Sequence, residues 1–597
     1  MNYLYINNDK YEFNIGMNLL DLIQKNKLGL ESPCGGNGTC GKCKLKIING
    51  NVNDLTDDEL KFLTDEEIKN NVRLSCLVYP KGDLSVEFIN NDNNVHKILT
   101  EGYIPNFNKS PMLSKKVYKI NKPTLQYNLS LEDNLKQEGI ILNDDFNILK
   151  SIPSIFEKDY CTVVYLGNEV IGLECEDTSE KLYGIALDIG TTTVVASLID
   201  INKQCEIDCE SDINPQKEYG LDVLSRIHYS KSNKEGLENL NRSIIDCINN
   251  LILELCKNNK INKDEIYEVA IAANTTMMHT LLKVSPNSIG KSPYSPVFTS
   301  GKSIKALDLG IEISMFGRVY LLPGVSSYIG ADIVAGVCVS DLSGTNKNIL
   351  FIDIGTNGEI VLSKRSKLSS CSCAAGPALE GMNISCGMRA GDGAIENIKI
   401  GKTIETKVIG NKEGKGLCGS GIIDAISEMA RLKLIGKTGR IIKKSEVETD
   451  DKLKHLSEHI VDENKKRRFI LDPQNPNISI TQEDIRQVQL AKGAILSGFY
   501  ALLNTMNIDI KELDEVIIAG QFGKHLSVDS LVGVGIIPKE LKENVRYIGN
   551  SSKTGAIMTL LSKDIRKDME RIARDISYCE LSTEDGYERL FANCLKF

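Results

Sequence analysis

The sequence Ile185-Ala-Leu-Asp188-Ile-Gly190-Thr-Thr-Thr193 contains a tetrapeptide, Asp-Ile-Gly-Thr, that recurs 165 positions later. The second copy lies in Ile349-Leu-Phe-Ile-Asp353-Ile-Gly355-Thr-Asn357-Gly358-Glu359. Each copy closes an apolar run that is typical of a buried strand. The glycine lets backbone N–H groups approach phosphate oxygens, the threonine hydroxyls donate to them, and the aspartate can hold hydrated Mg²⁺. One copy is equally consistent with a strand ending in a tight turn, whereas two copies predict two facing halves of a nucleotide site.

The composition limits the class of protein. At 597 residues the chain is too long for one core, and its length suggests about four domains. The net charge of −9 gives no electrostatic footprint for nucleic acid or an anionic membrane. No apolar stretch approaches the roughly 20 residues of a membrane helix, and no signal peptide is evident. The 17 cysteines indicate a reducing cytoplasm rather than a disulfide scaffold.

Four cysteines in the N-terminal region predict an iron–sulfur cluster. They follow a C-x₅-C-x₂-C…C pattern, at Cys34, Cys40, Cys43 and Cys76. A distant fourth ligand is typical of two-iron clusters, and the glycines between the first three let a loop wrap the cluster. The five-residue first gap resembles that of the adrenodoxin-like 2Fe–2S ferredoxins. The alternative is a structural zinc site, which usually pairs its ligands as two C-x₂-C knuckles, and only one such pair exists here.

The residues around these cysteines predict the order of elements. Alternating residues over 3–6 and 11–15 indicate a hairpin, Asn18 is expected to cap a helix over 19–25, and residues 45–48 and 84–88 read as further strands. This order resembles the β-grasp ferredoxin fold. Acidic residues crowd between Asp54 and Glu67, either as a solvated helical face or as a docking surface for a basic electron donor.

We divide the chain into four parts. Residues 1–95 form the 2Fe–2S ferredoxin-like domain, 96–113 a polar, proline-punctuated linker, 114–180 a small α/β middle domain, and 181–597 a two-lobed ATPase domain. The middle domain carries strand-like segments near 117–120, 161–165 and 170–173 and a helical stretch near 131–138, and discloses no chemistry. The overall fold class is therefore α/β multidomain.

Two further glycine clusters lie in the last part. The run Val516-Ile-Ile-Ala-Gly520-Gln-Phe-Gly523-Lys-His525 follows an apolar strand, and its glycines would let a purine and ribose lie against backbone. The run Gly416-Leu-Cys-Gly419-Ser420-Gly421 leads into a helical pattern, whose start could be capped by the serine or could hold an anion. No G-x-x-x-x-G-K-[ST] exists, which argues against a P-loop ATPase.

With the later Ala-Gly-Gln-Phe-Gly, the duplicated Asp-Ile-Gly-Thr resembles the superfamily of acetate and sugar kinases, heat-shock chaperones and actin. Within it, several runs resemble the ATP-dependent reductive activators of corrinoid proteins, and the resemblance spans the whole chain, least clearly over 96–180. These runs are Asn214-Pro-Gln, Tyr219-Gly-Leu-Asp-Val-Leu-Ser-Arg-Ile227, Ala273-Asn-Thr-Thr-Met277, Ala374-Ala-Gly-Pro-Ala-Leu-Glu-Gly381, Ile480-Thr-Gln-Glu-Asp-Ile-Arg-Gln-Val-Gln-Leu-Ala-Lys492 and Tyr578-Cys-Glu-Leu-Ser582.

The resemblance implies a β-grasp ferredoxin domain, a small middle domain and a duplicated actin-like ATPase core. It implies that one electron passes from a low-potential donor, such as a ferredoxin or flavodoxin, through the 2Fe–2S cluster to a corrinoid protein, reducing Co(II) to Co(I) with ATP. The implied catalytic residues are Asp188 and Asp353, which hold Mg²⁺ through water and position the attacking water, with Glu359 as a third. The implied nucleotide-binding residues are Gly190, Thr191, Thr192, Thr193, Gly355, Thr356, Asn357, Gly419, Ser420, Gly520 and Gly523.

Several residues near these motifs have a plain structural interpretation that we prefer. Cys371 and Cys373 are expected to be packed small residues, rather than a loop that touches the corrinoid partner. His279 is expected to be hydrogen-bonded in the core, and Arg226 to bridge a domain carboxylate rather than to bind phosphate.

Two other functions remain open from the sequence. One is a small-molecule kinase with a redox-sensing ferredoxin domain, and the other is a plain ferredoxin-type electron carrier with a structural C-terminal half. Activators of 2-hydroxyacyl-CoA dehydratases carry a 4Fe–4S cluster between subunits, which the cysteine spacing here does not support. The corrinoid partner, the electron donor and the choice between monomer and homodimer are not specified.

Overall fold

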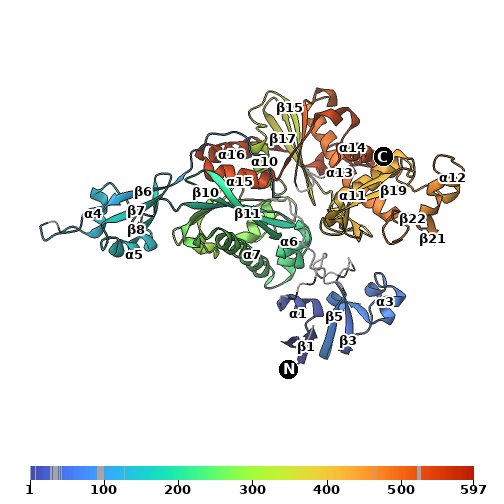
Figure 1. Cartoon of the computed structure of the whole chain (residues 1–597), viewed down its shortest axis with the longest axis horizontal. Coiled ribbons are helices and arrows are strands. Elements are labelled where there is room, and N and C mark those ends of the chain that lie inside the picture. The colour runs from blue at the N-terminus through green and yellow to red at the C-terminus, as the bar shows by residue number, and fades with distance from the viewer. Residues whose placement is uncertain are drawn as a thin grey trace.

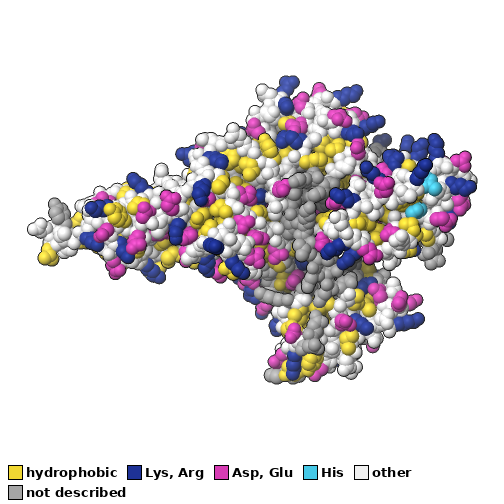
Figure 2. All heavy atoms as spheres, viewed as in Figure 1, with side chains coloured by type: hydrophobic (Ala, Val, Ile, Leu, Met, Phe, Trp, Pro, Cys, Tyr) yellow, Lys and Arg dark blue, Asp and Glu magenta, His cyan; other side chains and the backbone are white. Residues whose placement is uncertain are grey.

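The structure is a computed structural model. It describes residues 2–6, 9–26, 28, 30, 36, 38, 41, 43–89, 100–126, 128–463, 466–520 and 526–597. Figure 1 shows the N-terminal domain below the body of the molecule, a small domain projecting at the left, and two larger lobes that make up the body. Positive and negative side chains are interspersed over the face shown in Figure 2.

The N-terminal domain is a five-stranded sheet in the order β2-β1-β5-β3-β4. Asn18 accepts a hydrogen bond from the Asp21 N–H at 2.8 Å and so begins the first helix, which packs Leu19, Leu22 and Ile23 on the sheet. The predicted hairpin, capped helix and β-grasp order are confirmed. The elements are β1 (Asn2–Ile6), β2 (Asp9–Phe13), α1 (Leu19–Lys25), β3 (Lys44–Val52), α2 (Asp57–Leu60), α3 (Asp65–Lys69), β4 (Val72–Leu74) and β5 (Pro80–Phe88).

Two acidic residues between Asp54 and Glu67 stabilise this domain by capping helices and forming an ion pair. Glu59 and Glu67 complete capping boxes at the starts of α2 and α3. Glu59 is buried, and its carboxylate accepts hydrogen bonds from Nε and one Nη of Arg73, at 2.7 and 2.8 Å. Two of the seven acidic residues of this run therefore serve in helix capping, and one of these two also forms a buried ion pair.

The segment that we predicted as a linker is bound along the second lobe over its described part. The Tyr103 N–H donates to the Ile548 carbonyl at 2.9 Å, and the Ser110 N–H donates to the Leu561 carbonyl at 2.8 Å. Gly102 approaches so closely that a Cβ there would lie 2.4 Å from the Thr554 hydroxyl oxygen. Residues 100–112 are therefore fixed, and their polar composition alone did not reveal this.

The small middle domain is an antiparallel sheet in the order β6-β7-β8 that packs against two helices. It is attached to the first lobe by the buried Lys115, which donates to Glu174 at 2.7 Å and to the Tyr267 hydroxyl at 2.8 Å. The sequence did not predict the second helix. The elements are β6 (Leu113–Lys119), α4 (Leu131–Gln137), α5 (Phe146–Ile155), β7 (Tyr160–Leu166) and β8 (Glu169–Cys175).

The remaining chain contains two six-stranded sheets built on the same plan, which confirms the duplicated actin-like core. The sheet of the first lobe has the order β11-β10-β9-β12-β14-β13 and that of the second lobe β25-β24-β15-β16-β17-β26. In each, the Asp-Ile-Gly-Thr strand is antiparallel to the strand that follows it and parallel to a later one. The strands are β9 (Tyr183–Ile189), β10 (Thr193–Asp200), β11 (Cys205–Ile213), β12 (Ile266–Ala273), β13 (Lys302–Lys305), β14 (Arg318–Leu321), β15 (Asn348–Ile354), β16 (Gly358–Lys364), β17 (Lys367–Cys373), β24 (Glu515–Ala519), β25 (Val545–Gly549) and β26 (Ser577–Tyr578).

Helices join and cover these sheets. Residues of α10, α15 and α16 share one core with strands of both sheets, whereas α11, α13, α14 and α17 cover the opposite face of the second sheet. The helices are α6 (Val223–Ser232), α7 (Gly236–Asn259), α8 (Thr275–Leu281), α9 (Ala306–Leu309), α10 (Ala331–Val339), α11 (Gly419–Arg431), α12 (Lys444–Glu448), α13 (Gln482–Met506), α14 (Val528–Val534), α15 (Ser551–Leu561), α16 (Lys563–Asp575) and α17 (Tyr587–Cys594).

Two three-stranded sheets extend the second lobe. They are ordered β19-β18-β20 and β21-β22-β23. Their strands are β18 (Ala394–Ile400), β19 (Ile404–Val408), β20 (Gly416–Leu417), β21 (Ile460–Glu463), β22 (Lys466–Ile470) and β23 (Ser479–Thr481). Of the helices that the structure describes, none has the length and apolar content needed to cross a bilayer.

Candidate nucleotide site and cluster cysteines

The two Asp-Ile-Gly-Thr turns line one cavity of about 130 Å³ between the lobes. The structure thus brings together most of the residues that the sequence proposed for a nucleotide. From the predicted set, the cavity is lined by Asp188, Gly190, Thr191, Thr192, Thr193, Asp353, Gly355, Thr356, Asn357, Glu359 and Gly520.

The first turn joins β9 to β10 and is held from behind. The Gly190 N–H donates to the Thr193 carbonyl at 2.8 Å, which closes the turn. The fully buried Arg226 donates to the Thr191 carbonyl at 2.5 Å. It also donates to the Gly220 carbonyl, Gln216 and Met277, so our expectation that Arg226 bridges a carboxylate is not supported by these contacts. Arg226 instead supports the backbone of the first turn.

The second turn joins β15 to β16 in the same way. The Gly355 N–H donates to the Asn357 carbonyl at 3.0 Å, and Asp353 pairs with Glu359 across the two strands. Gly520 lies against this turn with φ of +91°, and a Cβ there would stand 2.4 Å from Oδ1 of Asp353. The glycine is therefore required by both its backbone conformation and its close approach.

Glu380 connects the two turns, and we did not single it out from the sequence. Its Oε1 accepts a hydrogen bond from the Thr356 hydroxyl at 3.0 Å, and its Oε2 accepts one from the Thr192 hydroxyl at 3.2 Å. Burial raises the pKa of Glu380, and these two threonine hydroxyls act in the opposite direction. The sequence signal was its place in the run 374–381, directly before Gly381.

Asn550 also reaches the cleft from a distant part of the chain. Its amide nitrogen donates to Oδ2 of Asp188 at 2.8 Å, while its side-chain oxygen caps α15 by accepting from the Lys553 N–H at 2.8 Å. Ser551 and Ser552 line the same cavity. The available signal was a polar residue between a strand and a helix, which is too common a pattern to indicate a site.

Five carboxylates line the cavity, those of Asp188, Asp332, Asp353, Glu359 and Glu380, and two of them, Asp332 and Glu380, were not predicted from the sequence. Burial, together with Asp332 and Asp188, raises the pKa of Asp353 to about 7. Burial and Asp188 raise the pKa of Asp332 to about 7 as well. The pKa of Glu359 is raised well above its ordinary value, by burial first and then by Asp332 and Asp353. Among the described lining residues there is no lysine or arginine, and no three of the described carboxylates form a direct metal-ligand group, so a Mg²⁺ ion here would be held through water.

Three predicted residues are not placed in the cavity. Gly419 and Ser420 begin α11 but do not line it: the Ser420 hydroxyl donates to the Glu396 carbonyl at 2.8 Å, and a Cβ on the adjacent Gly421 would stand 2.2 Å from the Ile395 carbonyl oxygen. The start of this helix is therefore packed against β18. Gly523 lies outside the described residues, as does His525.

The cluster cysteines are described in part. Cys43 and Cys76 are buried, and their sulfurs stand 3.3 Å apart, close enough to ligate one iron atom. Cys34 and Cys40 lie outside the described residues, and the described part of the chain holds no group of three potential metal ligands. The geometry of the described pair fits the predicted 2Fe–2S cluster.

Other cysteines and one histidine match their structural interpretation. Cys371 and Cys373 are buried beside Gly498, where a Cβ would stand 2.2 Å from the Cys373 sulfur. His279 is buried: its Nδ1 lies 2.7 Å from the Thr275 carbonyl oxygen, and its Nε2 lies 3.0 Å from the Val297 N–H nitrogen. These residues belong to the core.

The fold and the cleft together define an actin-like ATPase joined to a β-grasp iron–sulfur domain. Three family models match the chain. Residues 4–81 match the 2Fe-2S iron-sulfur cluster binding domain, residues 183–345 the RACo middle region, and residues 347–597 the C-terminal domain of RACo, the ASKHA domain. In the sequence, the boundary between the last two models falls after the last strand of the first six-stranded sheet and just before the first strand of the second.

Relatives match over most of the chain. It is 33% identical over 577 residues to the corrinoid activation enzyme RamQ of Eubacterium limosum, with 94% of this chain and 93% of the relative covered. It is 24% identical over 444 residues to the [Co(II) methylated amine-specific corrinoid protein] reductase of Methanosarcina barkeri, covering 69% of this chain and 76% of the relative. The solved structure of a reductive activator for corrinoid, iron–sulfur protein matches with a TM-score of 0.73 and 32% identity, over 100% and 98% of the two chains. This chain belongs to the family of corrinoid activation enzymes.

Proposed function

We propose that this protein reactivates a corrinoid protein by ATP-dependent reduction of its cobalt from Co(II) to Co(I). One electron would pass from a low-potential donor through the 2Fe–2S cluster to the partner. The observation that carries the proposal is that one chain joins a buried pair of cluster thiols, Cys43 and Cys76, to a cleft whose two phosphate turns lie on separate lobes.

The cleft residues would hold and cleave ATP. Thr191, Thr192, Thr193, Thr356 and Asn357 would bind phosphate oxygens through hydroxyl, amide and backbone groups, and Gly520 would face the adenosine. Asp188 and Asp353 would hold Mg²⁺ through water and orient the attacking water, with Glu359 and Asp332 beside them. The cluster, when bound, supplies one-electron transfer. The proposed contacts leave out Gly419 and Ser420, which do not line the cavity, while Gly523 stays a prediction outside the described residues.

The energetic need for ATP can be estimated. Each 100 mV of deficit costs a one-electron transfer about 2.3 kcal/mol. A plant-type cluster has a potential near roughly −400 mV. If the cobalt couple is more reducing than this, the electron transfer is unfavourable by a few multiples of that cost. Because the phosphate turns belong to different lobes, ATP is expected to bind the closed arrangement more tightly than the open one. That difference in affinity can favour one state of the bound partner.

The remaining features of the proposal rest on the sequence. A ferredoxin or flavodoxin is the proposed donor, and the thiol-rich composition favours work in the cytoplasm. The proposed assembly is a homodimer. The proposed domain boundaries are those of the four parts 1–95, 96–113, 114–180 and 181–597. Each of these points is open to direct measurement.

The test is reconstitution with a Co(II) corrinoid protein, a low-potential reductant and Mg-ATP. We expect the Co(I) absorption band to form with ATP and to be absent without it. Asp188→Asn should abolish ATP turnover and Co(I) formation while the visible spectrum of the 2Fe–2S cluster is retained. Formation of Co(I) at the same rate without nucleotide, or unchanged ATP turnover in the variant, would contradict the proposal.

A further inference from the structure

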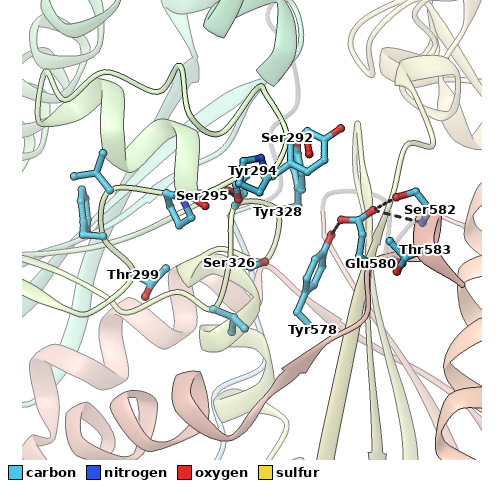
Figure 3. A pocket seen from close by; sticks show the side chains of 16 residues that line it. Ser292, Tyr294, Ser295, Thr299, Ser326, Tyr328, Tyr578, Glu580, Ser582 and Thr583 are labelled. Carbon is cyan, nitrogen blue, oxygen red and sulfur yellow. Dashed lines mark hydrogen bonds between the residues drawn. The ribbon is translucent and has the colours of Figure 1, made fainter.

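A second, larger cavity of about 670 Å³ lies between the lobes and takes no part in the site described above. Three chain segments form its walls (Figure 3). Two are loops of the first lobe, at 292–299 and 325–328, and the third is 578–583 of the second lobe, within the run Tyr578-Cys-Glu-Leu-Ser582 that the nucleotide site does not use.

The chemistry of the lining is aromatic and acidic. Tyr294 and Tyr328 meet edge to face with ring centres 5.7 Å apart, and Tyr578 approaches from the other lobe. Glu580 is the sole charged side chain among the described lining residues. Aromatic faces attract cations, and a carboxylate in a partly desolvated cavity adds to that attraction. The cavity therefore favours a positively charged group over a neutral or anionic one.

Glu580 is held in position and retains acceptor capacity. Its Oε1 accepts from the Ser582 hydroxyl at 2.8 Å, and its Oε2 accepts from the Tyr578 hydroxyl at 3.2 Å. A carboxylate offers about four acceptor positions in total, so Oε2 can accept a further donor. Because burial and Glu580 raise the pKa of Tyr578, that hydroxyl stays protonated and continues to donate.

The wall from the first lobe is fixed before any ligand enters. The Ser327 hydroxyl donates to the Tyr294 carbonyl at 2.6 Å, and the Tyr328 hydroxyl donates to the Ile289 carbonyl at 3.0 Å. The His279 ring stacks on Phe298 with centres 4.7 Å apart. Such pre-organisation lowers the conformational entropy lost on binding.

Both walls are continuous with the nucleotide cleft. On the first lobe, the Thr275 hydroxyl donates to the Ser326 carbonyl at 2.7 Å, and the preceding residue, Asn274, lines the cleft. On the second lobe, β26 pairs with β17 at Ser370, and two residues further on β17 pairs with β16 at Glu359. A movement of the lobes around ATP would therefore change the width of this cavity.

We propose that this cavity receives an arginine side chain of a partner protein, stacked on the tyrosines and paired with Glu580. The planar guanidinium stacks on aromatic rings and binds carboxylates through two nitrogens, which a lysine cannot match. The net charge of −9 also favours a basic partner surface. Identification of the partner as the corrinoid protein rests on the proposed function, whereas the arginine site itself does not.

Because the chain contains no tryptophan, the fluorescence of a single introduced tryptophan reports on its own surroundings. In the full-length protein, Tyr294→Trp places a single indole at the cavity while keeping an aromatic ring. The probe is the acetylated and amidated tripeptide Gly-Arg-Gly, compared with the same peptide carrying citrulline, which has the shape of arginine without its charge. We expect a saturable change in emission with the arginine peptide and an affinity about tenfold or more lower for the citrulline peptide.

Two further variants in the same background assign the site. Glu580→Gln should reduce the affinity for the arginine peptide to that of the citrulline peptide. Glu588→Gln, an exposed residue at the start of α17 outside the cavity, should leave it unchanged. Mg-ATP should shift the affinity about fivefold or more. The absence of saturable binding, equal binding of both peptides, or an affinity insensitive to Glu580→Gln would overturn the arginine site, and insensitivity to Mg-ATP would overturn its link to the cleft.

The titration requires neither ATP turnover nor cobalt reduction. Its failure therefore leaves the proposed reductive activation standing, and a failure to form Co(I) leaves the arginine site standing. If both fail, each is refuted by its own measurement.

Discussion

The Thr192 hydroxyl in the first phosphate turn donates a hydrogen bond across the cleft to Oε2 of Glu380, at 3.2 Å. The same carboxylate accepts from Thr356 in the second turn at 3.0 Å. One carboxylate therefore contacts two hydroxyls that belong to different lobes. Because both hydroxyls are proposed to bind phosphate, we infer that Glu380 positions them for the nucleotide.

Replacing Glu380 with alanine should slow ATP hydrolysis by about tenfold or more. A typical intramolecular hydrogen bond contributes about 0.5–1.5 kcal/mol, and two such bonds are lost. A barrier higher by about 1.4 kcal/mol slows a reaction tenfold. The measurement is steady-state release of phosphate from Mg-ATP. Glu405→Ala, at an exposed position on β19, is the matched control, and equal rates in the two variants would exclude a role for the bridge.

Gly520→Ala should abolish ATP hydrolysis and destabilise the protein. A non-glycine residue in left-handed backbone costs roughly 1–2 kcal/mol, and here the new Cβ would also stand 2.4 Å from Oδ1 of Asp353. Gly586→Ala is the control, because Gly586 has φ of +74° with no atom within 4 Å of its Cβ position. Denaturant unfolding and phosphate release should separate the two: both variants lose stability, and only Gly520→Ala loses activity. Full activity in Gly520→Ala would refute the close approach.

The two Asp-Ile-Gly-Thr turns could be predicted because each is a local pattern, in which an apolar strand is followed by aspartate, glycine and threonine. Glu380, Asp332 and Asn550 could not, because each is a single polar residue brought to the cleft by packing between distant elements. Gly419 and Ser420 show the opposite case. Their glycine-rich helix start resembles an anion site locally, but close packing on β18 uses the serine hydroxyl. Local motifs could therefore be predicted from the sequence, whereas the positions of residues brought together by packing of distant elements could not.

Cys43→Ser should remove the visible absorption of the 2Fe–2S cluster while ATP binding persists. The two functions are carried by separate folded units, and Cys43 packs in a small core of the N-terminal domain. Absorption spectroscopy after anaerobic reconstitution measures the first property, and calorimetry with Mg-ATP the second. Cys205→Ser removes an exposed thiol and should change neither. An intact cluster spectrum in Cys43→Ser would show that Cys43 is not a ligand.

Acidification should destabilise the protein through His279. Burial lowers the pKa of His279 in the folded state, so the folded protein favours the neutral ring. The neutral ring donates from Nδ1 to the Thr275 carbonyl and accepts at Nε2 from the Val297 N–H, at 2.7 and 3.0 Å. The resulting stability is present above the unfolded pKa near about 6.5. It is lost as the pH falls from there toward the folded pKa, because the unfolded chain takes up the proton first.

Denaturant unfolding between pH 7.5 and 5.5 measures this effect. The contribution of one histidine cannot exceed about 1.4 kcal/mol per pH unit. His279→Gln should be less stable than the unmodified protein at pH 7.5 and should show a shallower loss toward pH 5.5. His455→Gln removes an exposed ring that contacts the Gly401 carbonyl, and its pH dependence should match that of the unmodified protein. The Val297 N–H belongs to the wall of the second cavity. Lowering the pH from 7.5 to 5.5 should therefore also weaken binding of the arginine peptide. An unchanged pH slope in His279→Gln would show that the ring does not act as this acceptor.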